Sequence, residues 1–469
     1  MTILYFFAGV GTRLLSFAAA ILFARLMTPA DFGDYVLTLN NSLLWAMLSN
    51  YWLVTSAFRF LAMKNGQDAA RVVSTLLAGL CFSLLLAAVL GIASIAASFA
   101  PIRPALLPTA VVITVLSMVA DVSGACFTAA ADPKAYFNLT MRRAIVGFPA
   151  SLALIVTGFG VFGAMAGQIL GLIAGLFEPR VIALWGQARW HLADRALLKR
   201  IFFYGATGSL AFSLYMVIHV INRNFIALHL GGATAGRFAL AFDTFYAPIG
   251  MIGSAMSLGR MASMHAGAQE SVGTGLRQVA SYIEKVLLFA VPYAAGGWML
   301  APRLASLAFG KDIGAEVSSY AAIAAVHGAV MTLVSALLLG ILVLDRRFPL
   351  ILALAAIICA NSVALVVQGS AATVHSFAMA TFAAMGLSLI GLGIWLILVD
   401  GLRLRWCFLV LPATGAALMA AAISWTSFEG HIGAALSVLI GAGVYAIWCE
   451  VTGLWNIRIL VAARMPRMH

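Results

Sequence analysis

Charged residues are scarce in this sequence. Asp, Glu, Lys and Arg together make up 9% of its 469 residues, whereas soluble domains carry about 25%. Hydrophobic residues account for 63% of the chain, and the mean hydropathy is +1.03. Because a polar shell cannot be built from this composition, the sequence predicts a protein whose solvent is largely lipid. The apolar runs are continuous rather than alternating, which argues against a transmembrane barrel.

Signatures of catalysis and of metal binding are also missing. The sequence contains no GxSxG, HExxH or P-loop motif. The five cysteines lie singly in apolar segments, and the eight histidines make no ligand pair at i, i+4 spacing. We therefore predict a protein that is not an enzyme and has no catalytic residue, no cofactor and no metal site.

What the sequence does contain is a series of long apolar runs separated by short polar turns. These runs predict an all-α polytopic membrane protein with 14 transmembrane helices. Residues 3–25 are interpreted as a retained span, because no basic residue precedes them and Arg13 interrupts the run. The predicted spans are 3–25, 34–61, 72–99, 105–131, 142–160, 163–186, 200–229, 234–263, 272–301, 315–344, 348–368, 374–399, 404–425 and 431–455.

The basic residues are distributed unevenly between alternate loops. Of the 28 Lys and Arg residues, 19 lie in the loops of one side or in the tail, and five lie in the opposite loops. The positive-inside rule then predicts that both termini are cytoplasmic. The same distribution explains the net charge of +12 without a nucleic-acid partner.

An internal repeat predicts how the spans are grouped. Residues 28–37 (TPADFGDYVL) align with residues 231–240 (GGATAGRFAL), so that Gly33 falls on Gly236. Each stretch joins two long spans, and six spans separate the copies. This spacing favours two lobes related by a parallel repeat of six-helix units, with two extra helices at the C-terminus.

The predicted divisions follow from this repeat. Residues 1–186 form the N-terminal lobe, and 187–199 form a cytoplasmic linker that is either an interfacial helix or an ordinary basic loop. Residues 200–368 form the core of the second lobe, which span 12 completes at 369–399. Residues 400–469 supply the last two spans and a cytoplasmic tail.

Ionisable side chains inside the spans are the main functional candidates, because charge is costly in hydrocarbon and must face the bundle interior or a cavity. Guanidinium groups suit a diphosphate, which they bind through paired hydrogen bonds. The predicted diphosphate site consists of Arg13, Arg59, Arg223 and Arg260. Arg25 and Arg237 are predicted at a gate or at the outer edge, and Asp121, Asp243 and Glu284 at a coupling-ion or proton site.

Each of these residues also has a structural interpretation. Arg59 and Arg260 could snorkel to the cytoplasmic interface, and Arg25 and Arg237 could be charges at helix ends. Asp121 could accept a hydrogen bond from a neighbouring helix. Arg13 and Arg223 lie too deep for comfortable snorkelling, so a functional role is favoured for these two.

The second span carries amides and aromatic residues along an otherwise apolar helix. We predict Asn40, Asn41, Asn50 and Trp52 as sugar contacts. The same residues also fit interhelical hydrogen bonding and an interfacial aromatic belt.

Residues 13–17 (RLLSF) and 24–35 (ARLMTPADFGDY) resemble the amino-terminal signature of bacterial polysaccharide flippases. These are the Wzx-like, polysaccharide-transport branch of the multidrug/oligosaccharidyl-lipid/polysaccharide (MOP) exporter superfamily. The resemblance covers about the first sixty residues, including Arg59. It implies a cavity between two lobes, alternating access, and cavity or gate roles for Arg13, Arg25 and Arg59. Arg223 and Arg260 match no fixed motif and depend on the charge argument.

The resemblance implies export of an undecaprenyl-diphosphate-linked oligosaccharide across the bacterial cytoplasmic (inner) membrane, for O-antigen, capsule or exopolysaccharide synthesis. The expected partners are this substrate, membrane lipids, and the polysaccharide polymerase and chain-length machinery. One alternative is a cation-coupled multidrug or metabolite antiporter of the same superfamily, in which Asp121 and Asp243 would matter more than the arginines. A membrane polymerase or transferase and a non-transporting scaffold are the remaining alternatives.

Overall fold

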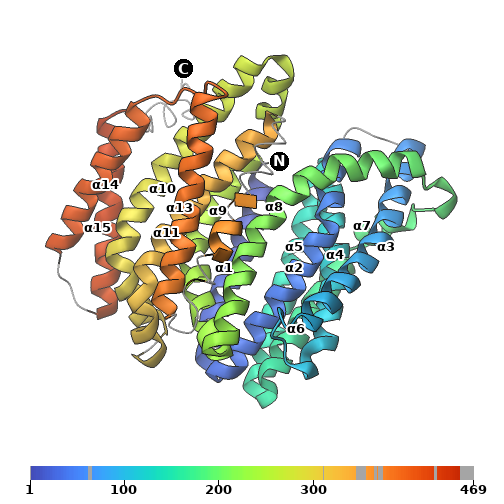
Figure 1. Ribbon diagram of the computed structural model, residues 1–469, viewed down its shortest axis with the longest axis horizontal. Helices are drawn as coiled ribbons and strands as arrows, with labels where there is room; N and C mark the ends of the chain where they lie inside the picture. Colours follow the sequence, from blue (N-terminus) through green and yellow to red (C-terminus); the bar gives the residue numbers. More distant parts are fainter. Residues whose placement is uncertain are drawn as a thin grey trace, which may run out of the picture. The chain divides into compact units, whose positions relative to one another are not determined.

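The computed structural model describes residues 2–61, 66–309, 311–344, 355–356, 358–363, 367, 373–426 and 430–454. The side chain of Arg13 lies outside the described part, as do other side chains within the described helices. The helices are α1 Thr2–Leu26, α2 Pro29–Phe60, α3 Gly66–Ala96, α4 Leu107–Ala129, α5 Pro133–Leu154, α6 Gly160–Leu176, α7 Pro179–Gly186, α8 Arg195–Leu230, α9 Gly232–Glu270, α10 Val272–Phe309, α11 Lys311–Val343, α13 Val374–Leu398, α14 Cys407–Trp425 and α15 Gly430–Val451 (Figure 1).

The predicted all-helical membrane fold is confirmed. No strand occurs among the described residues, and eight helical segments in them are long and apolar enough to cross a membrane. Every predicted span except 348–368 overlaps a helix named above; the described residues of 348–368 are helical, and the rest of this span lies outside the described part. The count of 14 spans is consistent with this arrangement.

The sequence around Thr28 explains why α1 ends and α2 begins there. Thr28 has an extended backbone, and its hydroxyl accepts a hydrogen bond from the Asp31 amide at 3.1 Å. Pro29 occupies the first helical turn, where its missing amide hydrogen costs nothing. The T-P-x-D part of the motif is therefore a helix start signal.

The chain divides into two compact units. The first comprises Met1–Thr244 with Asp345–Ala384, and the second comprises Phe245–Leu344 with Met385–His469. Both α9 and α13 continue from one unit into the other. The lobe boundaries inferred from the repeat remain a prediction.

The core of the first unit lies where α2, α3, α4 and α8 meet. Trp52, Leu53, Leu76, Met118 and Ile201 are all nearly inaccessible to solvent there. This cluster holds the second half of α2 against the first half of α8.

The hairpin of α5 and α6 is closed by a tight turn between the predicted spans 142–160 and 163–186. A π-helical turn covers Ile155–Phe159, and Gly158 has a φ of +92°. The two helices then pack with almost no side chain between them, because glycine recurs at every fourth residue of α6, at Gly163, Gly167, Gly171 and Gly175. A Cβ on Gly167 would lie 2.2 Å from the Ser151 amide nitrogen. Such close backbone approach is typical of helix pairs in membranes.

Replacing Gly167 by alanine is expected to destabilise the protein by about 1–3 kcal/mol, because the added methyl must displace the backbone of α5. The thermal midpoint of the purified protein in detergent should fall by several degrees. Gly391→Ala in α13 is the matched control, since a Cβ there meets nothing within 4 Å. Equal midpoints for the two variants would show that the α5–α6 contact is not tight.

The linker after α7 is anchored to α3. The Arg189 amide donates to Ser74 Oγ at 2.9 Å, and the Asp194 amide donates to Thr75 Oγ1 at 3.1 Å. Between them the chain forms a single 3-10 turn, Trp190–Leu192, and residues 195–199 already belong to α8.

Asp194 is the N-cap of α8, where its carboxylate accepts the Ala196 amide at 2.7 Å. Its hydrogen-bonded ion pair with Arg71 lowers the pKa of this carboxyl. The start of α8 is therefore fixed by a carboxylate that stays ionised at neutral pH.

In the second unit, α10 is the helix on which α14 and α15 are anchored. Tyr445 Oη donates to the Leu288 carbonyl at 2.7 Å. Glu284 is buried, and it accepts hydrogen bonds from the Arg405 amide at 2.9 Å and from the Arg405 guanidinium at 2.6 and 3.0 Å. These bonds hold the segment before α14 against α10.

Candidate functional site

Three consecutive polar residues near the end of α8, Asn222, Arg223 and Asn224, reach different neighbouring elements of the first unit. Asn224 and Asn41 of α2 exchange two amide hydrogen bonds, at 2.9 and 3.0 Å. All three residues of α8 are buried. The sequence Asn-Arg-Asn thus forms a polar junction inside an apolar bundle.

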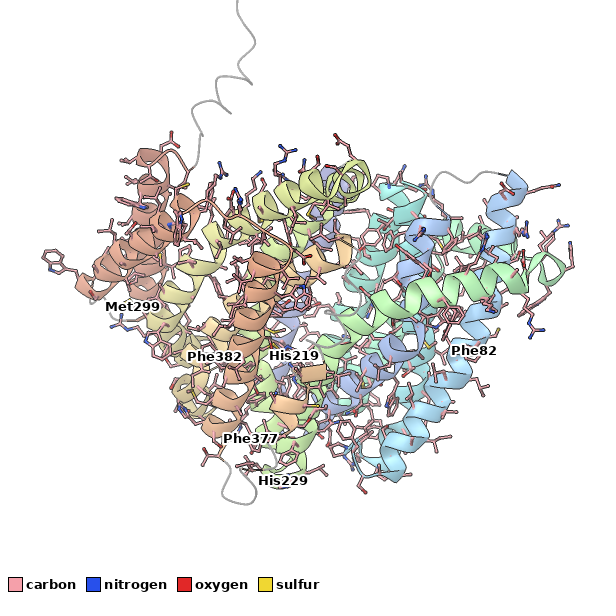
Figure 2. The ribbon with its side chains drawn as sticks, turned by 45° about the horizontal axis from the view of Figure 1, so that its top comes forward. Phe82, His219, His229, Met299, Phe377 and Phe382 are labelled. Atoms are coloured by element: carbon pink, nitrogen blue, oxygen red, sulfur yellow. The ribbon has the colours of Figure 1, made fainter. Side chains whose placement is uncertain are left out.

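Asn222 connects this junction to the part of the first unit that comes from later in the chain. It donates to Thr381 Oγ1 at 2.6 Å, and its oxygen accepts from Asn361 at 2.7 Å. Just beyond it on α8, Phe225 stacks on His229 and meets the edge of Phe377; His229 and Phe377 are labelled in Figure 2.

Arg223 forms an ion pair with Asp243 of α9. The two partners differ in accessibility, since the arginine side chain is 4% exposed and that of the aspartate 55%. Arg223 Nε has no hydrogen-bond partner among the described residues. The guanidinium therefore retains a donor that an anion could use.

The amides and the tryptophan predicted as sugar contacts are mostly used within the first unit. Asn41 bonds Asn224, and Asn50 donates to the Met118 carbonyl at 3.0 Å. Trp52 Nε1 donates to the Ser49 carbonyl and to Ser83 Oγ, at 2.7 and 3.0 Å. Asn40 alone of the four is half-buried. This geometry favours interhelical hydrogen bonding, and sugar contact remains a prediction.

A second polar site lies where α2 ends and α8 begins. The helices touch closely there, because a Cβ on Gly205 would lie 2.0 Å from the Trp52 carbonyl, and Ser56 Oγ donates to the Ile201 carbonyl at 2.7 Å. This packing brings Arg59 over the ring of Tyr204, with 4.4 Å from Cζ to the ring centroid.

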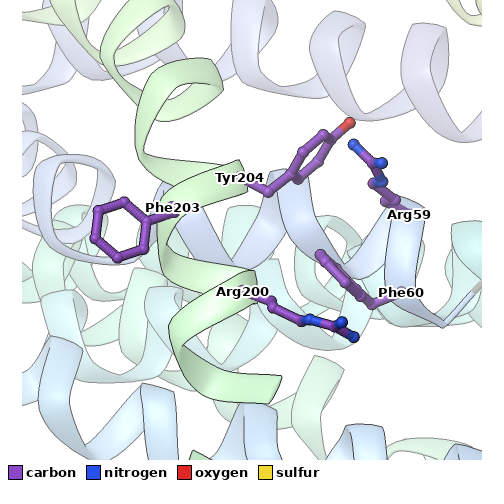
Figure 3. Close-up of a pocket in the computed structure, with 5 residues that line it drawn as sticks. All are labelled: Arg59, Phe60, Arg200, Phe203 and Tyr204. Carbon is purple, nitrogen blue, oxygen red and sulfur yellow. The ribbon is translucent and has the colours of Figure 1, made fainter. Parts of the chain in front are cut away.

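The cavity at this place has a volume of about 430 Å³. Figure 3 shows its lining, with Phe60 between the two arginine side chains. Both arginines are exposed, and no carboxylate of the described residues lies within ion-pair distance of either. The lining residues are Arg59, Phe60, Arg200, Phe203 and Tyr204.

The structure does not gather all predicted arginines into one described site. Arg59 lies in this cavity and Arg223 in the polar junction, whereas Arg260 is half-buried on α9 in the second unit. Arg25 is exposed at the end of α1, and Arg237 is half-buried near the start of α9. Arg13 falls outside the described side chains.

The three predicted carboxylates have different surroundings. Asp121 is exposed on α4, Asp243 pairs with Arg223, and Glu284 is engaged by Arg405. The four hydrogen bonds at Glu284 favour an anchoring role for it. Coupling-ion binding at these residues remains a prediction.

Of the five lining residues only Arg59 was predicted as a site residue from the sequence; Arg200 and Tyr204 are the polar ones that were missed. Arg200 counted only as one of the basic residues that set orientation. The signal that could have revealed them is their i, i+4 spacing, which places a guanidinium and an aromatic ring on one face of α8.

The turns at residues 28 and 231 also meet within the first unit. A Cβ on Gly33 would lie 2.2 Å from the Gly232 carbonyl oxygen, and one on Gly236 would lie 2.9 Å from Gly33 Cα. The two glycines that the repeat aligned therefore pack on each other.

Comparison with solved structures defines the class of this fold. The chain is similar to a lipid II flippase, MurJ, in an inward closed conformation, with 13% identity, coverage of 98% of this chain and 100% of that chain, and a TM-score of 0.74. A multidrug-resistance MATE transporter of the MOP superfamily, inward-facing, is 14% identical over 89% of this chain and 96% of that chain, with a TM-score of 0.58. An outward-facing MATE transporter of the same superfamily is 15% identical over 86% of this chain and 94% of that chain, with a TM-score of 0.57.

The fold is thus that of a multi-pass membrane transporter of the MOP type. A family model described as "Polysaccharide biosynthesis protein" matches residues 22–314, more than half of the chain. The chain belongs to this polysaccharide biosynthesis protein family, as the resemblance implied. No curated protein sequence matches it.

Proposed function

We propose that this transporter moves an undecaprenyl-diphosphate-linked oligosaccharide from the cytoplasmic to the outer leaflet of the bacterial cytoplasmic membrane. The observation that carries the proposal is the cavity with two accessible arginines, Arg59 and Arg200. Two guanidinium groups can form paired, charge-assisted hydrogen bonds with the oxygens of a diphosphate.

The neighbouring aromatic rings fit the same ligand. Arg59 lies over the Tyr204 ring, so the ring supports the face of the guanidinium and leaves its N–H edges for an acceptor. Phe60 and Phe203 supply apolar surface beside the charges. An amphiphile with an anionic head and a polyprenyl tail presents both kinds of group.

Alternating access supplies the movement. Arg59, near the end of α2, and Arg200, near the start of α8, lie on the side of the membrane predicted to be cytoplasmic. Gly33 and Gly236, near the starts of α2 and α9, lie on the opposite side. In this conformation the second pair is in contact, while the arginines are exposed. We infer a substrate-loading state in which the contact between the outer ends of α2 and α9 is closed, and a transported state in which this contact separates.

The decisive experiment uses a strain that lacks the gene and accumulates lipid-linked oligosaccharide. The Arg59→Ala/Arg200→Ala double variant should fail to restore surface polysaccharide although it is present in the membrane at normal levels. The purified double variant should bind undecaprenyl diphosphate at least about tenfold more weakly, since each contact to a charged group contributes about 1.5–3 kcal/mol.

Arg277→Ala is the control, because Arg277 is an exposed arginine whose side chain, among the described residues, donates to Thr274 alone. It should leave both transport and binding unchanged. Normal surface polysaccharide from the double variant would refute the diphosphate site. If deletion instead sensitised cells to cationic drugs and left the lipid-linked oligosaccharide unchanged, the antiporter alternative would be favoured.

A further inference from the structure

The linker and the first turns of α8 expose cations and large aromatic rings side by side. Trp190 is 63% exposed and Phe203 is 62% exposed. The basic side chains around them are exposed as well. We call this set the α8 entry surface, and its members are Arg189, Trp190, Arg195, Lys199, Phe202 and Phe203.

The helical part of this surface is one continuous face. At 100° per residue, Arg195, Lys199, Phe202 and Phe203 fall within an arc of about 100°. Ile201 lies roughly opposite, and Leu198 and the backbone at Gly205 lie between Ile201 and Phe202 around the helix; all three pack against α2 and α3. Phe202 meets the edge of the buried Trp52 ring at 5.3 Å and of Phe203 at 5.8 Å, so it joins the surface to the core. Trp190 and Phe203 are the rings that remain largely exposed.

The Trp190 turn is held outward rather than left free. Its flanking residues, Arg189 and Asp194, are hydrogen-bonded to Ser74 and Thr75 of α3. Asp194, the one carboxylate within the segment 187–204, is occupied by Arg71 and by the helix cap. No described carboxylate pairs with Arg189, Arg195 or Lys199. The surface thus presents positive charge with no counterion among the described residues.

We propose that the α8 entry surface binds the headgroups of anionic phospholipids, distinct from the transported substrate. Tryptophan and phenylalanine favour the boundary between headgroups and acyl chains. Lysine and arginine near an anionic membrane surface attract its headgroups. Long basic side chains can reach the phosphates while the rings of the same face enter the acyl region. The anchors on α3 keep these groups in place without a bound partner.

The test uses the full-length protein in nanodiscs that contain equal amounts of phosphatidylglycerol and phosphatidylcholine. In each sample only one of the two lipids is brominated on its acyl chains, and the two samples are compared. Bromine quenches the fluorescence of nearby tryptophans. The chain has ten tryptophans, so the signal of Trp190 is obtained as the difference in fluorescence between the wild type and Trp190→Phe. At low salt, the quenching should show a preference of at least about fivefold for phosphatidylglycerol. High salt should weaken the preference.

The variant Arg189→Gln/Arg195→Gln/Lys199→Gln should abolish this preference and leave the quenching by brominated phosphatidylcholine in place. Lys134→Gln/Arg277→Gln/Arg403→Gln removes the same number of exposed charges elsewhere and should keep the preference. Equal quenching by both lipids in the wild type would overturn the proposal, as would no quenching at all or a preference that survives the first triple variant. Arg59, Arg200 and Phe203, the ring that both sites share, are unchanged throughout, so the outcome does not depend on the diphosphate site.

Discussion

Replacing Gly33 by alanine is expected to abolish transport while the chain still inserts into the membrane. The new Cβ would lie 2.2 Å from the Gly232 carbonyl oxygen and 2.5 Å from its carbon, so the turn between α8 and α9 must move away from α2. Overpacking of this kind costs about 1–3 kcal/mol. A penalty confined to one conformation shifts a two-state equilibrium by about 5–150-fold.

The shift can be measured at Leu37, which is 2% exposed and packs beside Gly232 in this conformation. In a background without native cysteines, Leu37→Cys should resist a membrane-impermeant thiol reagent, and adding Gly33→Ala should make it react. Surface polysaccharide in the deletion strain should be lost in parallel.

Gly232→Ala is the matched control from the same contact, because its Cβ would come no closer than 3.7 Å, to Leu37 Cδ1. It should transport normally and leave the cysteine protected. Gly236→Ala should resemble Gly33→Ala, since its Cβ would lie 2.9 Å from Gly33 Cα. A transporting Gly33→Ala variant with a protected cysteine would show that this contact plays no part in the conformational change.

The contact between Gly33 and Gly236 also shows what a sequence can reveal. Their alignment required only the order of spans and turns, because apolar length and glycine or proline punctuation are local signals. The spans were predictable for the same reason. That the aligned glycines touch each other was not predictable, because it depends on the distance between two hairpins about 200 residues apart in the sequence.

The roles of individual polar residues were less predictable than the helices. Asn41 and Asn50 are both buried amides of α2, yet one bonds a side chain of α8 and the other bonds a backbone carbonyl of α4. Which neighbour each amide meets depends on the rotation of α2 and on the identity of the helices around it. A single sequence does not state how a helix is rotated or which helices surround it, so it identifies the polar residues but not their partners.

The same limit applies to Arg223, whose depth in α8 was evident but whose partner was not. Its ion pair with Asp243 is asymmetric, since the arginine is buried and the aspartate is largely accessible. Removing the aspartate leaves a buried cation alone, which costs about 3–5 kcal/mol. Removing the arginine leaves a carboxylate that is 55% exposed rather than enclosed by protein, so we expect a smaller cost.

We therefore expect Asp243→Asn to lower the thermal midpoint of the purified protein far more than Arg223→Gln does. Arg223→Gln/Asp243→Asn should recover the stability of Arg223→Gln, because no charge is then left buried. Equal losses in the two single variants would contradict the asymmetry.

The double variant then separates structure from transport. If Arg223 only balances Asp243, the stable double variant should restore surface polysaccharide in the deletion strain. If the spare Nε–H of Arg223 contacts the travelling diphosphate, the double variant should be stable and inactive. We expect the second result, the stable but inactive double variant. The buried guanidinium of Arg223 has an unused donor. The two amides beside it, Asn222 and Asn224, already have neutral partners. The junction could be connected without a charge, so the charge points to a ligand.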